Sequence, residues 1–481
     1  MAGEGTQASG RRAFGLHALV EARRAEQSEL FAKHVNPKFA RVLKTIGFDR
    51  TYVRGEGAYL WDDRGRRYLD MLSGFGMFNM GRNHPVVKAA IRDYLELDDP
   101  WKISLGTTLL PGLLAEKLLS YTPHLRKVYF ASTGTECVEA ALKFTRCATG
   151  REQVIYCEHA FHGLTYGSLS LNGCESFREG FVSFLPGPVA VPFGDLEALE
   201  RQLAAKPTAA FLVEPIQGKG VYPATPEFLL GAQELCRRYG AKLVLDEVQT
   251  GLGRTGEMFA YMHVAGLEPD LILVAKSLSG GFVPAGAVLM REEIFDRVFS
   301  RADRCMVHSS TFGQGGLAMA CGLAALHVLK TEGLADNAAD KGGKLLEGLK
   351  EMVPEFELLH SARGRGLMIG IEFGTPRSLG LRAAWAAIHK VNGGLFAQAI
   401  LMPLLDRHHI LSQVAGHDVD IIKLIPPLTL TDEDVAWFLD GFRQVMEEAH
   451  RFPGPLWTAA RDLIRFAVDN HAAAAARRVA L

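Results

Sequence analysis

Residues 242–256 read KLVLDEVQTGLGRTG, and this stretch decides between two very different folds. An apolar strand ends in Asp246 and Glu247, and three glycines then follow the Gly-x-Gly-x-x-Gly spacing that binds a dinucleotide pyrophosphate. In a dinucleotide fold, however, the first glycine follows its strand directly and an acid ends the next strand. Here the five residues from Asp246 to Thr250 separate the apolar run from Gly251, and Asp270 lies before the next strand instead of at its end. We therefore interpret the glycines as a flexible turn beneath a different cofactor.

Apolar strands alternate with helical segments on both sides of this stretch. Continuous apolar strands separated by helices predict a mostly parallel sheet that is covered on both faces, with ligands bound beyond the carboxyl ends of the strands. Helices are predicted near 135–148, 194–205 and 226–239. The predicted strands are VYFAS (128–132), QVIYC (153–157), AAFLVEP (209–215), KLVLDE (242–247), DLILVAK (270–276) and AGAVLM (285–290).

Composition restricts the class of protein. The 481 residues carry 53 Lys+Arg against 54 Asp+Glu, so the net charge of −1 does not favour nucleic acid or an anionic membrane surface as a partner. The 7 cysteines are scattered, which predicts reduced thiols, no metal site and a cytoplasmic location. No apolar run approaches the ~20 residues of a membrane span. A small metabolite is the expected partner.

The chain is expected to divide into segments of different character. Residues 1–12 are expected to be disordered and 13–47 helical, while GAYLWDDRGRRYLDML (57–72) predicts two short strands around a turn. Short strands and amphipathic helices after residue 330 predict a second, smaller α+β domain. The predicted boundaries are 1–36 (N-terminal arm or helix), 37–90 (first part of the small domain), 91–330 (large cofactor-binding domain), 331–450 (C-terminal small domain) and 451–481 (helical extension, to which we assign no function).

Lys276 and Asp246 carry the strongest chemical signal. A lysine is ordinarily a solvated surface amine, but Lys276 ends a predicted buried strand, where partial desolvation lowers its pKa and favours attack on a carbonyl carbon. Asp246 could cap a helix or form a structural ion pair. An ionised acid at a buried strand end needs a cationic partner, and a protonated pyridine nitrogen would serve. Together the two residues fit pyridoxal 5'-phosphate.

The cofactor's phosphate needs an anion site, for which FASTGTECVEAALK (130–143) is a candidate. A strand ends at Ala131, and the next residues lead into a helix whose free N–H groups and positive end suit an anion. Thr133 and Glu136 also match an ordinary capping box, so this motif is weak by itself.

Two further segments follow predicted strands. EHAFHGLT (158–165) contains Phe161, which could stack on a pyridine ring or belong to the core, and His162. Glu214 in LVEPIQG (212–218) ends a strand and could equally be a salt-bridge partner. We assign all three residues to the predicted cofactor site.

Over residues 37–447 the chain resembles the class III pyridoxal-phosphate-dependent aminotransferases, in the acetylornithine, ornithine, putrescine and omega-amine group. The resemblance implies a fold-type I homodimer whose active sites are shared across the interface, with a large α/β domain and a smaller α+β domain. The matching segments, in order, are YLWDDRGRRYLD, NMGRNHP, STGTECVEAALK, AFHG, VEPIQGKG, LVLDEVQTGLGRTG, LILVAKSLSGG, HSSTFGQGGLAMACGLAAL, GRGLMIGIEF and PPLTLT.

The resemblance also implies roles for individual residues. Lys276 would bind the cofactor aldehyde and move the substrate proton, and Asp246 would hold the ring nitrogen. The remaining implied contacts surround the ring and the phosphate: Val248 and Phe161 on opposite ring faces, Gln249 at the ring hydroxyl, Gly134 and Thr135 at the phosphate, and Thr311 at the phosphate of the neighbouring subunit.

Substrate preference is expected to depart from that of the ornithine-type members. Where relatives place an arginine that grips an α-carboxylate, this chain has Lys423, which lacks the two-pronged fit of a guanidinium. Apolar residues are expected nearby. We predict a primary amine donor without an α-carboxylate, long-chain or hydrophobic, and a keto-acid or aldehyde acceptor. The predicted substrate residues are Phe75, Phe78, Trp101, Leu164 and Lys423.

Other readings share some of these residues. An aminomutase, racemase or decarboxylase on the same fold would need the same lysine, aspartate and phosphate site. A dinucleotide enzyme and a non-catalytic scaffold are the remaining alternatives. Visible absorbance that depends on Lys276 would separate the pyridoxal readings from the last two.

Overall fold

The computed structural model describes residues 14–101, 103, 105–390 and 393–465. The chain divides into two compact units, Met1–Tyr52 and Val53–Leu481. The predicted disorder over 1–12 lies outside the described residues, as does the part 466–481 of the predicted helical extension 451–481.

The first unit is helical, as predicted for 13–47, but it is not one continuous helix. Asn36 interrupts it, because its side-chain oxygen accepts hydrogen bonds from the N–H groups of Lys38 (3.1 Å) and Phe39 (2.9 Å) and so caps a new helix that starts at Pro37. The helices are α1 (Leu16–Arg23), η1 (Arg24–Glu26), α2 (Gln27–His34) and α3 (Pro37–Thr45).

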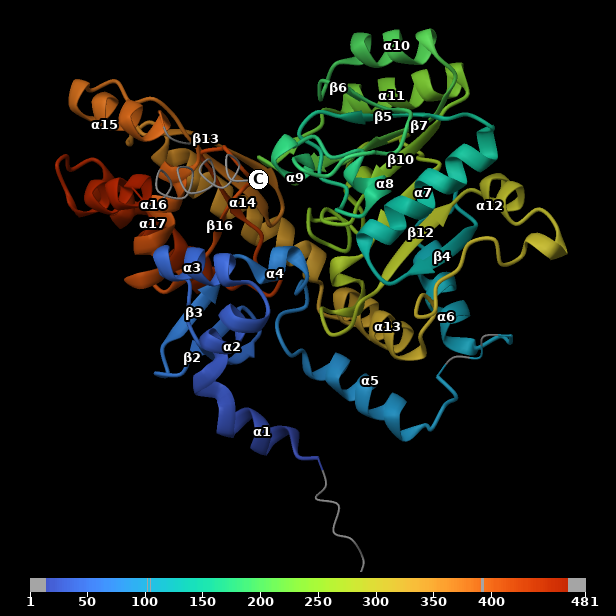
Figure 1. The fold of residues 1–481 in the computed structure, drawn as a ribbon, viewed down its shortest axis with the longest axis horizontal. Helices are drawn as coiled ribbons and strands as arrows, with labels where there is room; N and C mark the ends of the chain where they lie inside the picture. Colours follow the sequence, from blue (N-terminus) through green and yellow to red (C-terminus); the bar gives the residue numbers. More distant parts are fainter. Residues whose placement is uncertain (1–13, 102, 104, 391–392, 466–481) are drawn as a thin grey trace, which may run out of the picture. The chain divides into compact units, whose positions relative to one another are not determined.

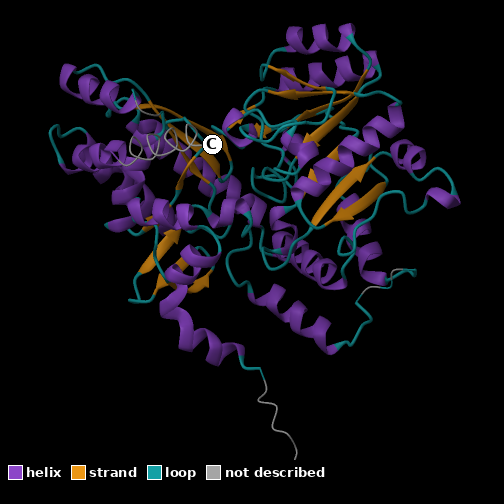
Figure 2. Cartoon of the chain, in the orientation of Figure 1, coloured by secondary structure: helices purple, strands orange, loops and turns teal. Residues whose placement is uncertain are grey.

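A seven-stranded sheet forms the centre of the second unit (Figures 1 and 2). Only β12 runs antiparallel to its neighbours, which confirms the predicted mostly parallel sheet. The sequence prediction missed β6, a short edge strand that starts at a proline. In sheet order the strands are β4 (Lys127–Ala131), β12 (Gly286–Met290), β11 (Leu271–Val274), β10 (Lys242–Asp246), β7 (Thr208–Val213), β5 (Gln153–Cys157) and β6 (Pro188–Val191).

Helices cover both faces of this sheet because successive side chains of each strand point to opposite faces. In β7, Ala210 and Leu212 join the core cluster that is shared with α7 (Gly134–Thr149), whereas Phe211 lies 6.2 Å from Phe228 of α11 (Pro226–Tyr239). The predicted helices of this region are thus confirmed. The third predicted helix is α10 (Leu196–Ala205). The helical segments of this region that were not predicted are α5 (Pro85–Glu96), α6 (Leu109–Leu119), α8 (Tyr166–Leu169), α9 (Glu175–Arg178), η2 (Ala260–His263), η3 (Lys276–Ser279), α12 (Glu292–Val298), η4 (Ala302–Arg304) and α13 (Gly316–Thr331).

Smaller sheets are assembled from both ends of the chain. Strand β15 (Ile410–Leu411) pairs in parallel with β3 (Arg67–Asp70) across more than 300 residues of sequence. One four-stranded sheet has the order β1 (Tyr52–Glu56), β2 (Tyr59–Asp62), β3, β15, a second has β13 (Leu359–Arg365), β14 (Met368–Phe373), β17 (Ile421–Leu424), β16 (Gln413–Val414), and β8 (Ile216–Gln217) pairs with β9 (Tyr222–Pro223).

The helices beside these small sheets are α14 (Leu334–Met352), α15 (Leu379–His389), α16 (Leu395–Asp406) and α17 (Asp432–Ala449), and α4 (Ser73–Gly76) is a single left-handed turn. Over the described ranges, no single helix is long and apolar enough to cross a membrane. The pair α13 and α14, bent by 60°, passes the same length and composition test when its two helices are taken together.

The glycine-containing turn after β10, which we predicted to be flexible, is buried and cross-linked by Arg254. This guanidinium is fully buried and donates hydrogen bonds to the carbonyl of Leu367 (3.0 Å), to the side-chain oxygen of Asn79 (2.5 Å) and to the carbonyl of Pro426. Burial lowers its pKa to about 9. Arg254 therefore joins the turn after β10 to three separate segments beside the smaller sheets.

We expect Arg254→Ala to lower the free energy of unfolding by about 3 kcal/mol or more, because it leaves several buried acceptors without donors. The measurement is the urea midpoint of the variant against the parent protein. The matched control is Arg201→Ala, whose side chain is 67% exposed and which should change stability by less than about 0.5 kcal/mol. Equal midpoints for the two variants would contradict a structural role for Arg254.

Candidate active site

Lys276 and Asp246 lie at the same edge of the central sheet. Strands β10 and β11 are parallel neighbours, with Asp246 opposite Leu273, so the last residue of β10 and the residues that follow β11 leave the sheet together. Lys276 begins η3 with a left-handed backbone (φ 46°), a conformation that is strained for a residue with a Cβ. The site thus contains an amine and an acid held at one sheet edge.

The Asp246 carboxylate is buried and hydrogen-bonded on both oxygens. Its Oδ2 lies 2.8 Å from Nδ1 of His162, and its Oδ1 accepts a hydrogen bond from the N–H of Val248 (3.0 Å). Burial disfavours the charged imidazolium, but the hydrogen bond and the charge of Asp246 outweigh it and raise the pKa of His162. The Asp246 carboxylate is therefore held in one orientation by partners on both oxygens.

Burial lowers the pKa of Lys276, while the charges of Asp246 and Glu214 oppose this shift. Among the described residues, no hydrogen-bond or ion-pair partner is found for its ammonium nitrogen. A lysine with a lowered pKa and no partner has a larger fraction of neutral, nucleophilic amine. This is the behaviour that was predicted from the sequence.

The predicted phosphate site is the N-terminus of α7. Thr133 caps the helix by accepting a hydrogen bond from the N–H of Glu136 (3.3 Å), but the Glu136 carboxylate accepts from Ser132 N–H (2.7 Å), so the capping box is not reciprocal. The start of the helix packs closely on Val248, just after β10: a Cβ on Gly134 would lie only 2.9 Å from a methyl of Val248. The first N–H groups of a helix lack partners within it, and this terminus has the chemistry of an anion site.

Thr135, the second predicted phosphate residue, joins a group of hydroxyls that the sequence did not reveal. Its Oγ1 lies 2.8 Å from Oγ1 of Thr165 and 2.6 Å from Oγ of Ser168. Glu139 completes the group by accepting hydrogen bonds from the N–H groups of Gly167 (2.9 Å) and Ser168 (3.1 Å) and from the Thr165 hydroxyl. These contacts fix the loop after β5 against α7.

Glu214 holds the backbone of two segments beside the site. Its carboxylate accepts hydrogen bonds from the N–H groups of Phe161 (3.2 Å) and Gly218 (2.9 Å), and burial raises its pKa. Phe161 is 40% exposed and packs edge-on against Phe177, with ring centroids 5.5 Å apart. Phe161 and Glu214 therefore belong to one wall of the site.

Lys423 lies in the same site and is buried. Its ammonium donates hydrogen bonds to the carbonyl of Gly218 (2.8 Å) and to Oε1 of Gln249 (3.2 Å), and Gln249 in turn donates to the carbonyl of Phe75 (3.0 Å). Burial, followed by the positive charge of Lys276, lowers the pKa of Lys423 to about 7. The sequence placed Lys423 in the site, but it did not indicate that Lys423 and Gln249 bond to each other.

The remaining predicted residues lie at the surface of the unit or beside the site. Leu164, Phe75 and Trp101 are exposed, and Trp101 packs against Phe312 at 5.5 Å. Phe78 is half-buried, with the Arg82 guanidinium 4.2 Å above its ring. Thr311 is exposed in this chain, so its predicted contact with a neighbouring subunit stays a prediction.

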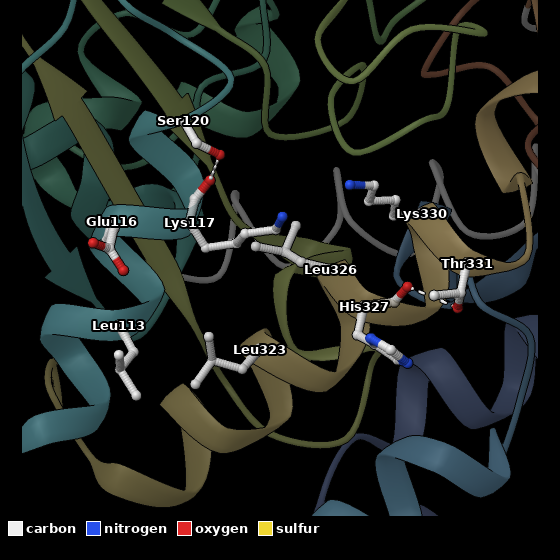
Figure 3. Close-up of a pocket in the computed structure, with 9 residues that line it drawn as sticks. All are labelled: Leu113, Glu116, Lys117, Ser120, Leu323, Leu326, His327, Lys330 and Thr331. Carbon is white, nitrogen blue, oxygen red and sulfur yellow. Dashed lines mark hydrogen bonds between the residues drawn. The ribbon is translucent and has the colours of Figure 1, made fainter.

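A separate groove lies between α6 and α13 and contains none of the predicted site residues (Figure 3). It is lined by leucines and by polar or charged side chains, namely Leu113, Glu116, Lys117, Ser120, Leu323, Leu326, His327, Lys330 and Thr331. Within the part of the chain that the structure describes, no cluster of His, Cys, Asp or Glu is placed to hold a metal ion.

Comparisons with known proteins agree with this geometry. A family model described as "Aminotransferase class-III" matches residues 44–446. The aminotransferase PigE of Serratia sp. (strain ATCC 39006) is 32% identical over 462 residues, which cover 89% of this chain and 54% of the relative, so the chain spans about half the length of that curated relative. The ornithine aminotransferase of Toxoplasma gondii ME49 is 29% identical with a TM-score of 0.75, covering 89% of this chain and 99% of that one. A PLP-bound amine transaminase from an uncultivated Pseudomonas species is 28% identical with a TM-score of 0.73, covering 83% and 94%.

The cofactor is therefore pyridoxal 5'-phosphate, and the site residues fit it. They supply an amine with a lowered pKa, a buried carboxylate for the ring nitrogen and a helix N-terminus for the phosphate. Glycine at 163 leaves room for Thr135 at the predicted phosphate site, because a Cβ there would lie 2.4 Å from Oγ1 of Thr135. The individual ring and phosphate contacts remain predictions.

We expect Lys276→Ala to abolish the visible absorbance of the bound cofactor, because the variant lacks the amine that we predict to attach to it covalently, while the Lys423 ammonium stays bonded to Gly218 and Gln249. Absorbance is recorded after desalting, which removes cofactor that is not covalently held. The control is Lys330→Ala, in the groove between α6 and α13, which should keep the spectrum unchanged. A desalted Lys276→Ala protein with full absorbance would exclude Lys276 as the attachment residue.

Proposed function

Because the chain belongs to the class III aminotransferase family, we propose that it moves the amino group of an apolar primary amine, one without an α-carboxylate, to a keto acid or aldehyde. The enzyme is a pyridoxal-phosphate-dependent aminotransferase, and the identities of donor and acceptor are the proposed part. The observation that supports the choice of donor is Lys423, which binds Gly218 and Gln249 instead of forming the two-pronged carboxylate site of a guanidinium.

Lys276 carries the proton transfers in this proposal. Pyridoxal phosphate, when bound, supplies an aldehyde that reacts with amines and a pyridine ring that withdraws electrons from the adjacent carbon. Nζ of Lys276, when it is not attached to the cofactor, would take the proton from the substrate carbon and would later give that proton back. The lowered pKa of Lys276 supports this role, because a neutral amine accepts a proton and an ammonium does not.

Asp246 keeps the ring nitrogen protonated, and its neighbours keep Asp246 in place. His162 binds one carboxylate oxygen and the N–H of Val248 binds the other, so the carboxylate is oriented before any ligand arrives. Nε2 of His162 is buried and has no hydrogen-bond partner in the described structure. The imidazole thus acts on Asp246 alone, as a positioning residue.

The donor side of the site is apolar. Phe75 is 59% and Leu164 52% exposed, and Phe161, three residues before Leu164 in the segment after β5, is 40% exposed. Exposed apolar groups of this size favour ligands with hydrocarbon chains, because their burial is worth about 25 cal/mol per Å² of apolar surface. A long-chain or hydrophobic amine would cover them.

The acceptor would meet Lys423. A keto-acid carboxylate could bind this ammonium only by replacing the carbonyl of Gly218 or the amide oxygen of Gln249 as its partner. We infer that keto acids bind weakly and that the reaction follows a ping-pong order, in which the first product leaves before the acceptor enters the same site.

A homodimer with shared active sites completes the proposal. Several segments of the second unit expose large apolar side chains that a second copy would cover, and one of them contains the loop with Thr311. These exposed residues include Leu97, Leu105, Leu109, Met306 and Phe312. The loop with Thr311 would then reach the phosphate of the partner's site.

In a series of unbranched primary amines we expect kcat/KM to rise roughly fourfold per added methylene until the apolar wall is covered, since each buried methylene is worth about 0.8 kcal/mol. Initial rates with a fixed acceptor provide the measurement. Turnover without any acceptor would indicate an aminomutase, racemase or decarboxylase. If ornithine or acetylornithine were much better donors than the simple amines, the proposed donor class would be wrong.

We expect Lys423→Arg to lower the KM for 2-oxoglutarate by about tenfold, the gain from one stronger charge-assisted hydrogen bond. Because the pKa of Lys423 is lowered to about 7, its charge is present below that pH and is lost as the pH rises through it. The parent KM for 2-oxoglutarate should therefore rise above about pH 7, whereas the arginine variant stays charged and shows no such rise. An aldehyde acceptor, which has no carboxylate, is the control. The same KM in both proteins across this pH range would remove Lys423 from the carboxylate site.

A further inference from the structure

The turn that carries Phe75 has an unusual backbone. Four successive residues adopt left-handed conformations, with φ of 41° at Ser73, 60° at Gly74, 62° at Phe75 and 85° at Gly76. Glycine adopts such angles freely, but serine and phenylalanine do not. Strained residues of this kind persist only where their surroundings hold them.

The first half of the turn is held from the smaller sheets. Asp70 accepts hydrogen bonds from the N–H groups of Leu72 (3.1 Å) and Ser73 (2.7 Å), and Arg82 donates to the other Asp70 oxygen at 2.7 Å. The Ser73 hydroxyl donates to the carbonyl of Ile425, two residues after Lys423 (2.6 Å). Asp70 and the carbonyl of Ile425 therefore hold Ser73 from two different segments.

The second half is held by Gln249 and Lys423. Gln249 donates from Nε2 to the carbonyl of Phe75, while its Oε1 accepts from the Lys423 ammonium, so the amide is fixed at both ends. The ammonium is itself fixed by the carbonyl of Gly218. Gly218 lies close to this amide, because a Cβ there would be 2.9 Å from Oε1 of Gln249 and would displace it. Thus Gly218, Lys423, Gln249 and Phe75 form one continuous hydrogen-bonded chain.

We propose that Lys423 and Gln249 are positioning residues that hold the left-handed turn 73–76, and with it the Phe75 ring, in place for an apolar substrate. This deepens the function proposed above and rests on it for the role of Phe75. An acidic acceptor that recruits Lys423 removes the partner of Gln249 and loosens the turn. The same hydrogen-bonded chain therefore holds the turn 73–76 and the Phe75 ring fixed when the donor binds. It lets them move when an acidic acceptor binds.

The first arm of the test is hydrogen exchange of the cofactor-loaded protein without substrate. The N–H groups of Met77 and Phe78 both bond to the Ser73 carbonyl and report on the turn. Lys423→Met and Gln249→Leu should each speed exchange of these amides about tenfold or more, the effect of losing one hydrogen bond in the chain. Lys219→Met is the matched control. Lys219 follows Gly218 directly in the sequence, but its ammonium donates to the thiol of Cys174 (3.6 Å) and not to the chain that holds the turn. Unchanged exchange in both test variants would overturn the proposal.

The second arm separates the turn from the donor. Phe75→Asn removes the ring and keeps the turn, because asparagine tolerates left-handed angles. The KM for a long-chain amine should rise at least about fivefold in Phe75→Asn and in Lys423→Met, with exchange accelerated only in the latter. If exchange accelerates in Lys423→Met but the amine KM stays constant in both variants, the turn is held as proposed and the donor class assigned to Phe75 is wrong.

Discussion

Two adjacent parallel strands must end at the same edge of their sheet, and the active site depends on this constraint. Strand β10 delivers Asp246, and β11 is followed after one residue by Lys276. No long loop has to bring the acid and the amine together, since the backbone hydrogen bonds of the sheet already do so. The helix α7 then approaches close enough to β10 to complete the cofactor site, because residue 134 has no Cβ.

Each of the two buried acids at this edge, Asp246 and Glu214, has hydrogen-bond partners. Asp246 pairs with His162, whereas Glu214 is met by backbone N–H groups and has a raised pKa. Burial lowers the pKa of both Lys276 and Lys423, and the positive charge of Lys276 lowers the pKa of Lys423 further. A site that must both attack a carbonyl and move protons near neutral pH benefits from amines of this kind.

The sequence predicted those parts of the fold that local pattern encodes. The strand that ends at Asp246 and the strand that precedes Lys276 are continuous apolar runs, and helices that follow other strands, such as α7 and α11, are amphipathic. The parallel sheet and the lysine–aspartate pair could therefore be predicted directly. The pattern did not reveal β6, which is short and begins with proline, or β13, whose alternation is interrupted by glycine. Nor could it reveal the bond between Lys423 and Gln249, which joins positions 174 residues apart and depends on tertiary packing.

Arg254 has a consequence for how substrates enter. Its guanidinium bonds to acceptors near both ends of the chain, at Asn79, Leu367 and Pro426, while its backbone belongs to the turn after β10. A hinge motion that separated the smaller sheets from the central sheet would break all of these buried hydrogen bonds at once. The hydrogen bonds of Arg254 therefore oppose a hinge at this point, and a substrate of the proposed function would meet exposed side chains such as Phe161 and Leu164. Under the proposed function, variation in those side chains would change which amines bind without altering the frame that holds Lys276 and Asp246.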